Sequence, residues 1–125
     1  MTYIVRILMP EYPTTRGTYS RRFGIVDKIA SDLGIILTGL SKEYLKDEIV
    51  SKNDLVIIKD LDPLSCFVAG IARGMGIKVI GAKFEVLPVD HQKMKQFCET
   101  VVQGEKELRQ TLIHFVETGE LNGED

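Results

Sequence analysis

Apolar residues along this chain fall into two patterns that alternate from one end to the other. Short continuous apolar runs, rich in β-branched residues, indicate buried strands. Longer segments with apolar residues every three or four positions indicate amphipathic helices. The predicted strands cover residues 3–9, 35–37, 55–58 and 77–82, and the predicted helices cover residues 19–33, 41–52, 65–75 and 91–117.

This alternation predicts the fold class. The run at residues 55–58 is apolar at every position, which is typical of a central strand covered on both faces. We expect an α/β fold with a flavodoxin-like or Rossmann-like sheet of four or five parallel strands, helices on both faces and a long C-terminal helix. Residues 1–118 are predicted to form a single domain, and the polar residues 119–125 a flexible tail. Gly70 and Gly74 are expected to let their helix lie close to the sheet.

The longest predicted helix spans residues 91–117. Four of its apolar residues recur every seven positions, namely Met94, Val101, Leu108 and Phe115. This spacing fits an amphipathic helix that covers the sheet. It also fits a helix that packs on another helix, including one from a second copy of the chain. Gly104 lies inside the segment, where it could bend or divide the helix.

Composition and charge narrow the classes of partner. The 125 residues carry a formal charge of -2, without the excess of lysine and arginine that binding of duplex nucleic acid requires. No apolar run approaches the roughly 20 residues that span a bilayer. The first apolar run also lacks the charged leader of a secretory signal. We therefore expect a cytoplasmic protein with neither a membrane nor a duplex nucleic acid as its partner.

The cysteines and histidines do not indicate a metal site. Cys66 and Cys98 lack the spacing of metal ligands and are expected to be free thiols in a reducing compartment. Cys66, near the start of a predicted helix, fits either a reactive thiol or a small buried residue. Neither His91 nor His114 pairs with a cysteine or a carboxylate at the spacing of metal ligands. We expect neither a metal nor a cofactor.

Hydroxyl groups, a glycine and arginines are concentrated between the first predicted strand and the first predicted helix. A helix N-terminus presents unpaired N–H groups to an anion, and arginine binds phosphate through two parallel hydrogen bonds. The segment has neither the P-loop spacing nor the Gly-x-Gly-x-x-Gly spacing, so a polar surface loop with ordinary helix caps is the alternative. The residues expected to bind phosphate are Thr15, Arg16, Gly17, Ser20 and Arg21, with Arg22 as an alternative to Arg21.

A second polar loop follows the central predicted strand. It contains Asp60, Asp62 and Ser65, at the end of the strand where open α/β sheets bind ligands. The two carboxylates are candidates to accept hydrogen bonds from sugar hydroxyls or to hold a metal. The alternative is that they cap the loop and the following helix. We expect Asp62 and Ser65 to contribute to a ligand site, and we treat Asp60 and Asp62 as candidate catalytic residues.

Three segments resemble one family, the nucleoside 2-deoxyribosyltransferase and 2'-deoxynucleoside 5'-phosphate N-hydrolase superfamily. They are TYIVRILMP with the helix after it, SKNDLVIIKDLDP, and FVAGIARGMGIKVIGA. The superfamily cleaves or transfers the N-glycosidic bond of deoxynucleosides or their monophosphates through a carboxylate nucleophile. The matching position here holds Val68, and the family's upstream aspartate falls near Lys46. The resemblance therefore implies a nucleotide-like ligand and the loss of the usual reaction.

Three hypotheses of function follow. The first is binding of a nucleotide or nucleoside-phosphate-like small molecule without N-glycosidic chemistry. The second is an active N-glycosidase or deoxyribosyltransferase with a relocated carboxylate, for which Asp60, Asp62 and Glu11 are candidates. The third is a self-associating structural or interaction module, suggested by the repeat of apolar residues over 94–115. A homodimer or a higher oligomer is compatible with each of them.

Overall fold

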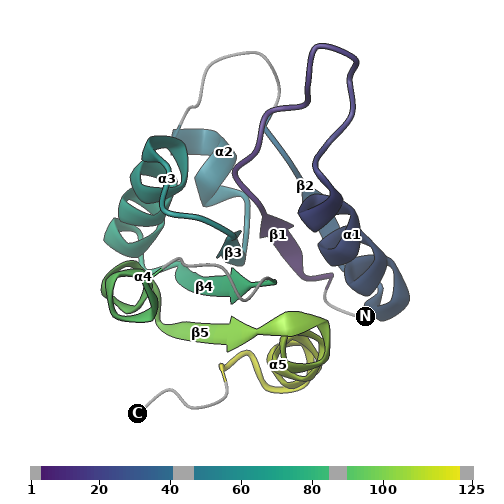
Figure 1. The fold of residues 1–125 in the computed structure, drawn as a ribbon. Coiled ribbons are helices and arrows are strands. Elements are labelled where there is room, and N and C mark those ends of the chain that lie inside the picture. Colours follow the sequence, from purple (N-terminus) through teal and green to yellow (C-terminus); the bar gives the residue numbers. More distant parts are fainter. Residues whose placement is uncertain (1–3, 41–46, 85–89, 122–125) are drawn as a thin grey trace.

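A five-stranded parallel sheet forms the centre of the molecule in the computed structural model, which describes residues 4–40, 47–84 and 90–121 (Figure 1). All neighbouring strands pair in parallel, in the order β2-β1-β3-β4-β5. This is the flavodoxin-like strand order, and it confirms the predicted α/β fold class. The strands are β1 (Arg6–Leu8), β2 (Ile36–Thr38), β3 (Leu55–Ile58), β4 (Lys78–Lys83) and β5 (Thr100–Gln103).

Helices cover both faces of the sheet. Helices α1 and α5 pack on one face, and α2, α3 and α4 pack on the other (Figure 1). Each face has its own apolar cluster because side chains of the central strand alternate between them. Within β3, Leu55 and Ile57 enter the first cluster, whereas Val56 and Ile58 enter the second. The helices are α1 (Arg21–Leu33), α2 (Asp47–Ser51), α3 (Pro63–Gly74), α4 (His91–Phe97) and α5 (Gly104–Thr118).

Helices α1 and α3 begin at the capping residues that their sequences provide. The Ser20 side chain accepts a hydrogen bond from the Phe23 amide at the start of α1, and α1 ends at Gly34 with a left-handed φ of 70°. The Asp62 side chain accepts a hydrogen bond from the Ser65 amide at the start of α3, with Pro63 in the first turn. The local sequence therefore determines the residues at which α1 and α3 begin, at the carboxyl edge of the sheet.

The predicted helix over residues 91–117 is wrong, because its middle is a strand. Helix α4 ends at Phe97, and Thr100–Gln103 form the edge strand β5. The Glu99 amide donates to the Val79 carbonyl over 2.9 Å, and the Glu99 carboxylate accepts from the Val79 amide over 2.5 Å, which joins this segment to β4. Gly104 has a φ of 81°, a conformation that favours glycine, and begins α5 as a separate helix.

The apolar repeat of seven residues consequently does not form one helical stripe. Met94 lies in the cluster beneath α3 and α4, whereas Leu108 and Phe115 lie in the cluster beneath α1 and α5. Val101 is part of β5. These residues fill two cores on opposite faces of the sheet, so they do not provide the self-association surface that the repeat suggested.

The expected role of Gly70 and Gly74 is also wrong. Both lie on the outer face of α3, and a Cβ atom added at either glycine would meet nothing within 4 Å. The close approach on this face of the sheet is at Gly81 in β4, where an added Cβ would lie 2.5 Å from the Met94 sulfur. A smaller residue on the strand, rather than on α3, therefore makes room for α4.

Three further expectations concern the start of the second helix, the C-terminal tail and membrane-spanning segments. The predicted start of a helix at Ser41 lies outside the described residues, within which α2 begins at Asp47. Leu121, in the expected tail, is buried in the cluster beneath α1 and α5, and residues 122–125 lie outside the described part. No helix in the described ranges has the length and apolar character needed to cross a membrane.

Candidate functional site

The strand order places a crevice between the loops that follow β1 and β3. The chain moves from β1 outward to β2 in one direction and from β3 outward to β4 in the other. In folds of this kind, ligands bind at this switch in direction, beyond the carboxyl ends of the strands. Glu11 lies in the loop after β1, and Lys59 follows β3 directly. Their side chains meet at the switch point.

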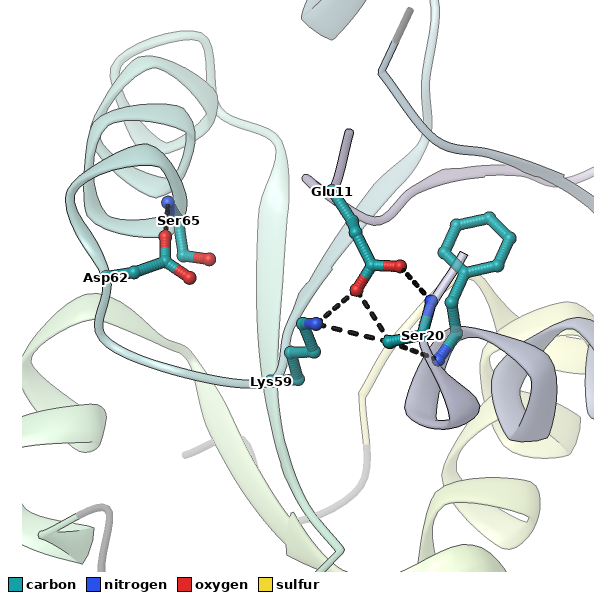
Figure 2. A network of polar contacts seen from close by, with 6 residues as sticks. Glu11, Ser20, Lys59, Asp62 and Ser65 are labelled. Carbon is teal, nitrogen blue, oxygen red and sulfur yellow. Dashed lines mark hydrogen bonds and ion pairs between the residues drawn. The ribbon is translucent and has the colours of Figure 1, made fainter. Parts of the chain in front are cut away.

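A polar network connects the two loops to the start of α1 (Figure 2). Lys59 Nζ forms an ion pair with Glu11 Oε1 and also donates to Ser20 Oγ over 3.2 Å. The Ser20 amide donates to Glu11 Oε2 over 2.6 Å, and the Ser20 hydroxyl donates to Glu11 Oε1 over 2.7 Å. Only 9% of the Glu11 surface is exposed. The network therefore holds the first residue before α1 against the end of β3.

The environment of Glu11 favours its charged form. Burial acts to raise the pKa of Glu11, but the hydrogen bonds from Lys59 and Ser20 and the charge of Lys59 together lower that pKa below its usual value. An ionised Glu11 neutralises Lys59 and accepts three hydrogen bonds. Its oxygens are engaged by the protein, which makes Glu11 a poor nucleophile.

The Ser20 hydroxyl is fully used in the same way. Its proton is donated to Glu11, and its oxygen accepts from Lys59 and from the Phe23 amide at 3.2 Å each. A serine hydroxyl has one proton and two lone pairs, so no hydrogen-bonding capacity is left for attack on a substrate. The network therefore positions the start of α1.

A cavity of about 390 Å³ opens beside this network at the N-terminus of α1. Its size lies within the range of small-molecule sites in proteins. It lies on the face covered by α1 and α5, because Ile25 and Phe84 pack against the apolar cluster of that face. Its lining residues are Ser20, Arg21, Arg22, Ile25, Lys59 and Phe84.

The lining of this cavity combines basic and apolar side chains. Arg21, Arg22 and Lys59 contribute three basic side chains, and no acidic side chain lines the cavity among the residues whose placement is described. The charge of Lys59 is balanced by Glu11. The first turn of α1 contains no acidic residue, so its dipole adds to the positive potential. This arrangement attracts an anion, and Phe84 offers an aromatic surface beside it.

Two of the residues predicted to bind phosphate line this cavity. Ser20 and Arg21 do so, with Arg22 next to them. Thr15, Arg16 and Gly17 instead form an exposed turn, closed by a hydrogen bond of 2.8 Å from the Gly17 amide to the Thr14 carbonyl. They are not among the lining residues. Their role in binding stays a prediction.

The loop after β3 caps α3 through Asp62. Capping was the alternative to ligand binding for the aspartates of this loop. Asp62 Oδ1 accepts from the Ser65 amide over 2.7 Å, and Asp60 Oδ1 accepts from the Leu61 amide over 2.8 Å. Figure 2 shows Asp62 and Ser65 at the start of α3, apart from the network around Glu11. The Ser65 hydroxyl is buried and has no hydrogen-bond partner among the described residues. Val68 is also fully buried, in the second apolar cluster.

Sequence reasoning did not assign Lys59, Ile25 or Phe84 to the site, although these residues line the cavity. Glu11 was considered only as a displaced carboxylate. Lys59 and Phe84 directly follow β3 and β4. Their positions at the carboxyl ends of parallel strands were the available signal. Which of these positions face a common cavity depended on the strand order.

Neither cysteine has the properties of a reactive thiol. Burial and the negative charges of Asp62 and Asp60 raise the pKa of Cys66. Burial and the charge of Glu99 raise the pKa of Cys98 to about 12. A raised pKa leaves little thiolate, which is the nucleophilic form. Within the described ranges, no group of three His, Cys, Asp or Glu residues is arranged to hold a metal ion.

A second cavity, of about 300 Å³, lies at the opposite edge of the sheet. Its lining includes Val5 and Asp54, which precede β1 and β3, together with Phe115 from α5. The amino ends of the strands are not where parallel α/β sheets bind ligands. The cavity at the N-terminus of α1 is therefore the better candidate for the functional site.

Comparisons with known proteins support the fold and name no function. No protein-family model matches the chain, and no curated protein matches it. A crystal structure of a conserved protein from Enterococcus faecalis V583 is similar, with a TM-score of 0.64 and 15% sequence identity. The similarity covers 90% of this chain and 99% of that chain. At this identity the likeness shows a shared fold alone.

Proposed function

We propose that the cavity at the start of α1 binds a nucleotide or a nucleoside-phosphate-like molecule. The observation that carries this proposal is the lining, which combines basic side chains and a helix N-terminus with an aromatic ring. In the proposed complex, the phosphate lies against Arg21 and the first turn of α1. The planar base lies against Phe84 and Ile25. Anions bind well at helix N-termini, and arginine matches the geometry of phosphate oxygens.

The proposed activity is binding without cleavage of the N-glycosidic bond. The carboxylates near the switch point are engaged in the fold, since Glu11 is paired with Lys59 and Asp62 caps α3. Val68, at the position that corresponds to the nucleophile in the resembling superfamily, is buried and apolar. A nucleophilic carboxylate must reach the anomeric carbon with a free oxygen. Both Glu11 oxygens accept hydrogen bonds and Val68 has no carboxylate, which supports binding without cleavage. Asp60 and Asp62 each use one oxygen to accept a hydrogen bond from a backbone amide, and they stay candidates for the alternative.

Calorimetric titration tests the proposal directly. The probes are the four common deoxynucleoside 5'-monophosphates, the matching nucleosides and inorganic phosphate. We expect at least one monophosphate to bind more tightly than its nucleoside and than phosphate alone, because the cavity offers contacts to both parts. Absence of binding by every probe up to millimolar concentration would contradict the proposal.

The variant Arg21→Gln locates the phosphate. A hydrogen bond to a charged group contributes about 1.5–3 kcal/mol, so we expect the affinity for the monophosphate to fall about tenfold or more. The affinity for the nucleoside should change less than about twofold. Arg16→Gln is the matched control, because it removes the same charge from the exposed turn outside the cavity. A larger loss with Arg16→Gln would move the phosphate to that turn.

Incubation of the protein with the same monophosphates tests for catalysis. Chromatography of each monophosphate after prolonged incubation should show no free base above the level without protein. Release of base by the wild-type protein would contradict binding without cleavage. It would favour the alternative of an N-glycosidase with a relocated carboxylate, and Asp60 and Asp62 would be the first residues to substitute.

A further inference from the structure

The outer face of α3 carries Phe67, the most exposed large apolar side chain among the described residues. Phe67 is 61% exposed and Met75, at the end of the helix, is 42% exposed. The outer face of α1 instead carries Asp27 and Lys28. That of α5 combines the charged residues 105–107 with Ile113 and Val116, which are 37% and 40% exposed. A helix on the surface of a monomer normally presents polar residues to solvent. The exposed ring of Phe67 is the clearest departure from this pattern on the described helices.

Two glycines give this face a specific shape. Gly70 and Gly74 lie one turn apart on the exposed side of α3, with open space where their side chains would be. Glycine is a poor helix former, and neither glycine makes room for another part of the described chain. Glycines at this spacing allow the backbone of a second helix to approach closely. The exposed ring of Phe67, one turn before Gly70, is suited to pack beside such a helix.

We propose that α3 is the interface of a homodimer, in which the α3 helices of two copies pack antiparallel about a two-fold axis. A two-fold interface uses the same surface on both copies. An axis that passes between Gly70 and Ile71 sets Phe67 of each copy at the level of Gly74 in the other. The large side chain then fills the space that the glycine leaves open. A single surface that carries both the projection and the recess is complementary to itself.

The charges at the ends of α3 support the antiparallel arrangement. Asp60 and Asp62 lie at its N-terminal end, and Arg73 lies in its last turn. Arg73 is 44% exposed at its side chain and bonds to Glu99 and to the Gln96 carbonyl of its own chain. Antiparallel packing brings the acidic end of each helix toward the basic end of the other. Parallel packing would align like charges.

The proposed interface leaves the cavity free. Helices α3 and α1 lie on opposite faces of the sheet (Figure 1). The cavity opens beside α1. A second copy on α3 therefore neither blocks the cavity nor contributes to it. The dimer does not rest on the proposed binding of nucleotides, and each proposal can fail without the other.

The test is the mass of the protein in solution. Light scattering after size exclusion and sedimentation velocity are run over a concentration series, with a chain mass of 14.0 kDa as the reference for the monomer. We expect the wild-type protein to reach twice this mass as concentration rises. The variants Phe67→Lys and Gly70→Gln should raise the dissociation constant of the dimer at least tenfold.

Gly24→Gln is the matched control for Gly70→Gln. Gly24 is an exposed glycine inside α1, and a Cβ atom added there also meets nothing within 4 Å. The two substitutions improve helix propensity equally, so only a contact at α3 separates them. Circular dichroism should show that both variants are folded. The control should keep the dissociation constant of the wild-type protein within about twofold.

Two outcomes would overturn the proposal. One is a wild-type protein that stays at the mass of one chain over the whole concentration series. The other is an assembly whose dissociation constant is unchanged in both Phe67→Lys and Gly70→Gln, since its interface would then lie elsewhere. Loss of the dimer in Gly24→Gln to the same extent as in Gly70→Gln would also count against an interface at α3.

Discussion

Glu11 and Lys59 show how single side chains hold the candidate site together. The two residues are 48 positions apart, and their side chains keep only 10% and 15% of their surface exposed. Removing one member of a buried pair leaves the other charge without compensation, which is more damaging than losing a pair on the surface. The site should therefore depend more strongly on this pair than on the exposed ion pairs of the molecule.

The variant Glu11→Ala should lower the free energy of unfolding by about 3 kcal/mol at pH 7. The reason is that Lys59 stays buried without its partner and Ser20 loses two hydrogen bonds. Urea denaturation followed by circular dichroism measures the effect. Asp32→Ala is the control, because its ion pair with Arg109 is exposed and should contribute less than about 1 kcal/mol. Equal losses in the two variants would contradict the importance of burial.

The pH dependence of stability should also depend on Glu11. The pKa of this residue is lower in the folded protein than its usual value of 4.5. The unfolded chain therefore binds a proton more readily, and the contribution of Glu11 is complete above pH 4.5. It is lost as the pH falls through the lower pKa of the folded state. Urea denaturation between pH 7 and pH 3 measures this loss.

The variant Glu11→Gln separates this contribution from other acidic groups. Its free energy of unfolding should fall less steeply below pH 4.5 than that of the wild-type protein, so that the difference between the two proteins narrows. The sign follows from the lowered pKa, since only the wild-type protein must protonate this carboxylate. A difference that is constant from pH 7 to pH 3 would show that Glu11 does not titrate as described.

At the scale of elements, the start of α3 shows that Asp62 has a structural role. Asp62 occupies the capping position, where its side chain satisfies an amide of the first turn. Asp60 accepts a hydrogen bond from the amide of Leu61, the adjacent residue of the loop. A capping side chain contributes to the stability of its helix whether or not a ligand binds. Stability measurements can therefore identify the cap without knowledge of the ligand.

The variant Asp62→Ala should lower the free energy of unfolding by about 1 kcal/mol through loss of the cap. Asp60→Ala should lower it by less than about 0.5 kcal/mol. Thermal denaturation of both variants beside Asp62→Asn, which keeps an oxygen acceptor, measures the effect. We expect Asp62→Asn to retain most of the stability. Similar losses in Asp60→Ala and Asp62→Ala would argue against a specific capping role.

The elements also show where local spacing misled the prediction. The segment from residue 91 to residue 117 satisfies a helical pattern, yet Thr100–Gln103 pair with β4 as a strand. A short strand and the turns beside it can match a seven-residue repeat, because the repeat does not record which core each residue enters. Pairing with β4 satisfies the backbone of this segment, and that pairing outweighs its helical spacing.

At the scale of the whole molecule, the sheet separates two surfaces. The face covered by α1 and α5 carries the cationic cavity, and the face covered by α2, α3 and α4 carries the exposed Phe67. Binding and self-association are therefore proposed for opposite sides of one sheet. The free-energy changes caused by variants on the two sides should be additive, because distant sites without shared contacts do not influence each other.

Most of the fold could be predicted from the chain by itself, because its signals are local. The apolar run Leu55–Ile58 needs cover on both faces, and this requirement determined a central parallel strand. The helical spacing located α1 to within two residues, whereas α3 begins at Pro63, two residues before the predicted start, because Asp62 caps it. Ser20 and Arg21 were assigned to a binding site because they stand at the start of a helix.

Only the tertiary structure decided what these elements bring together. The strand order joined Glu11 to Lys59 and set Phe84 beside Arg21, because it determines which carboxyl ends share a crevice. It also turned Gly70 and Gly74 toward solvent and made residues 100–103 an edge strand. Local spacing specifies which side chains of an element are buried. Contacts between residues far apart in the chain specify which residues those side chains pack against, and these contacts exist only once the sheet has formed.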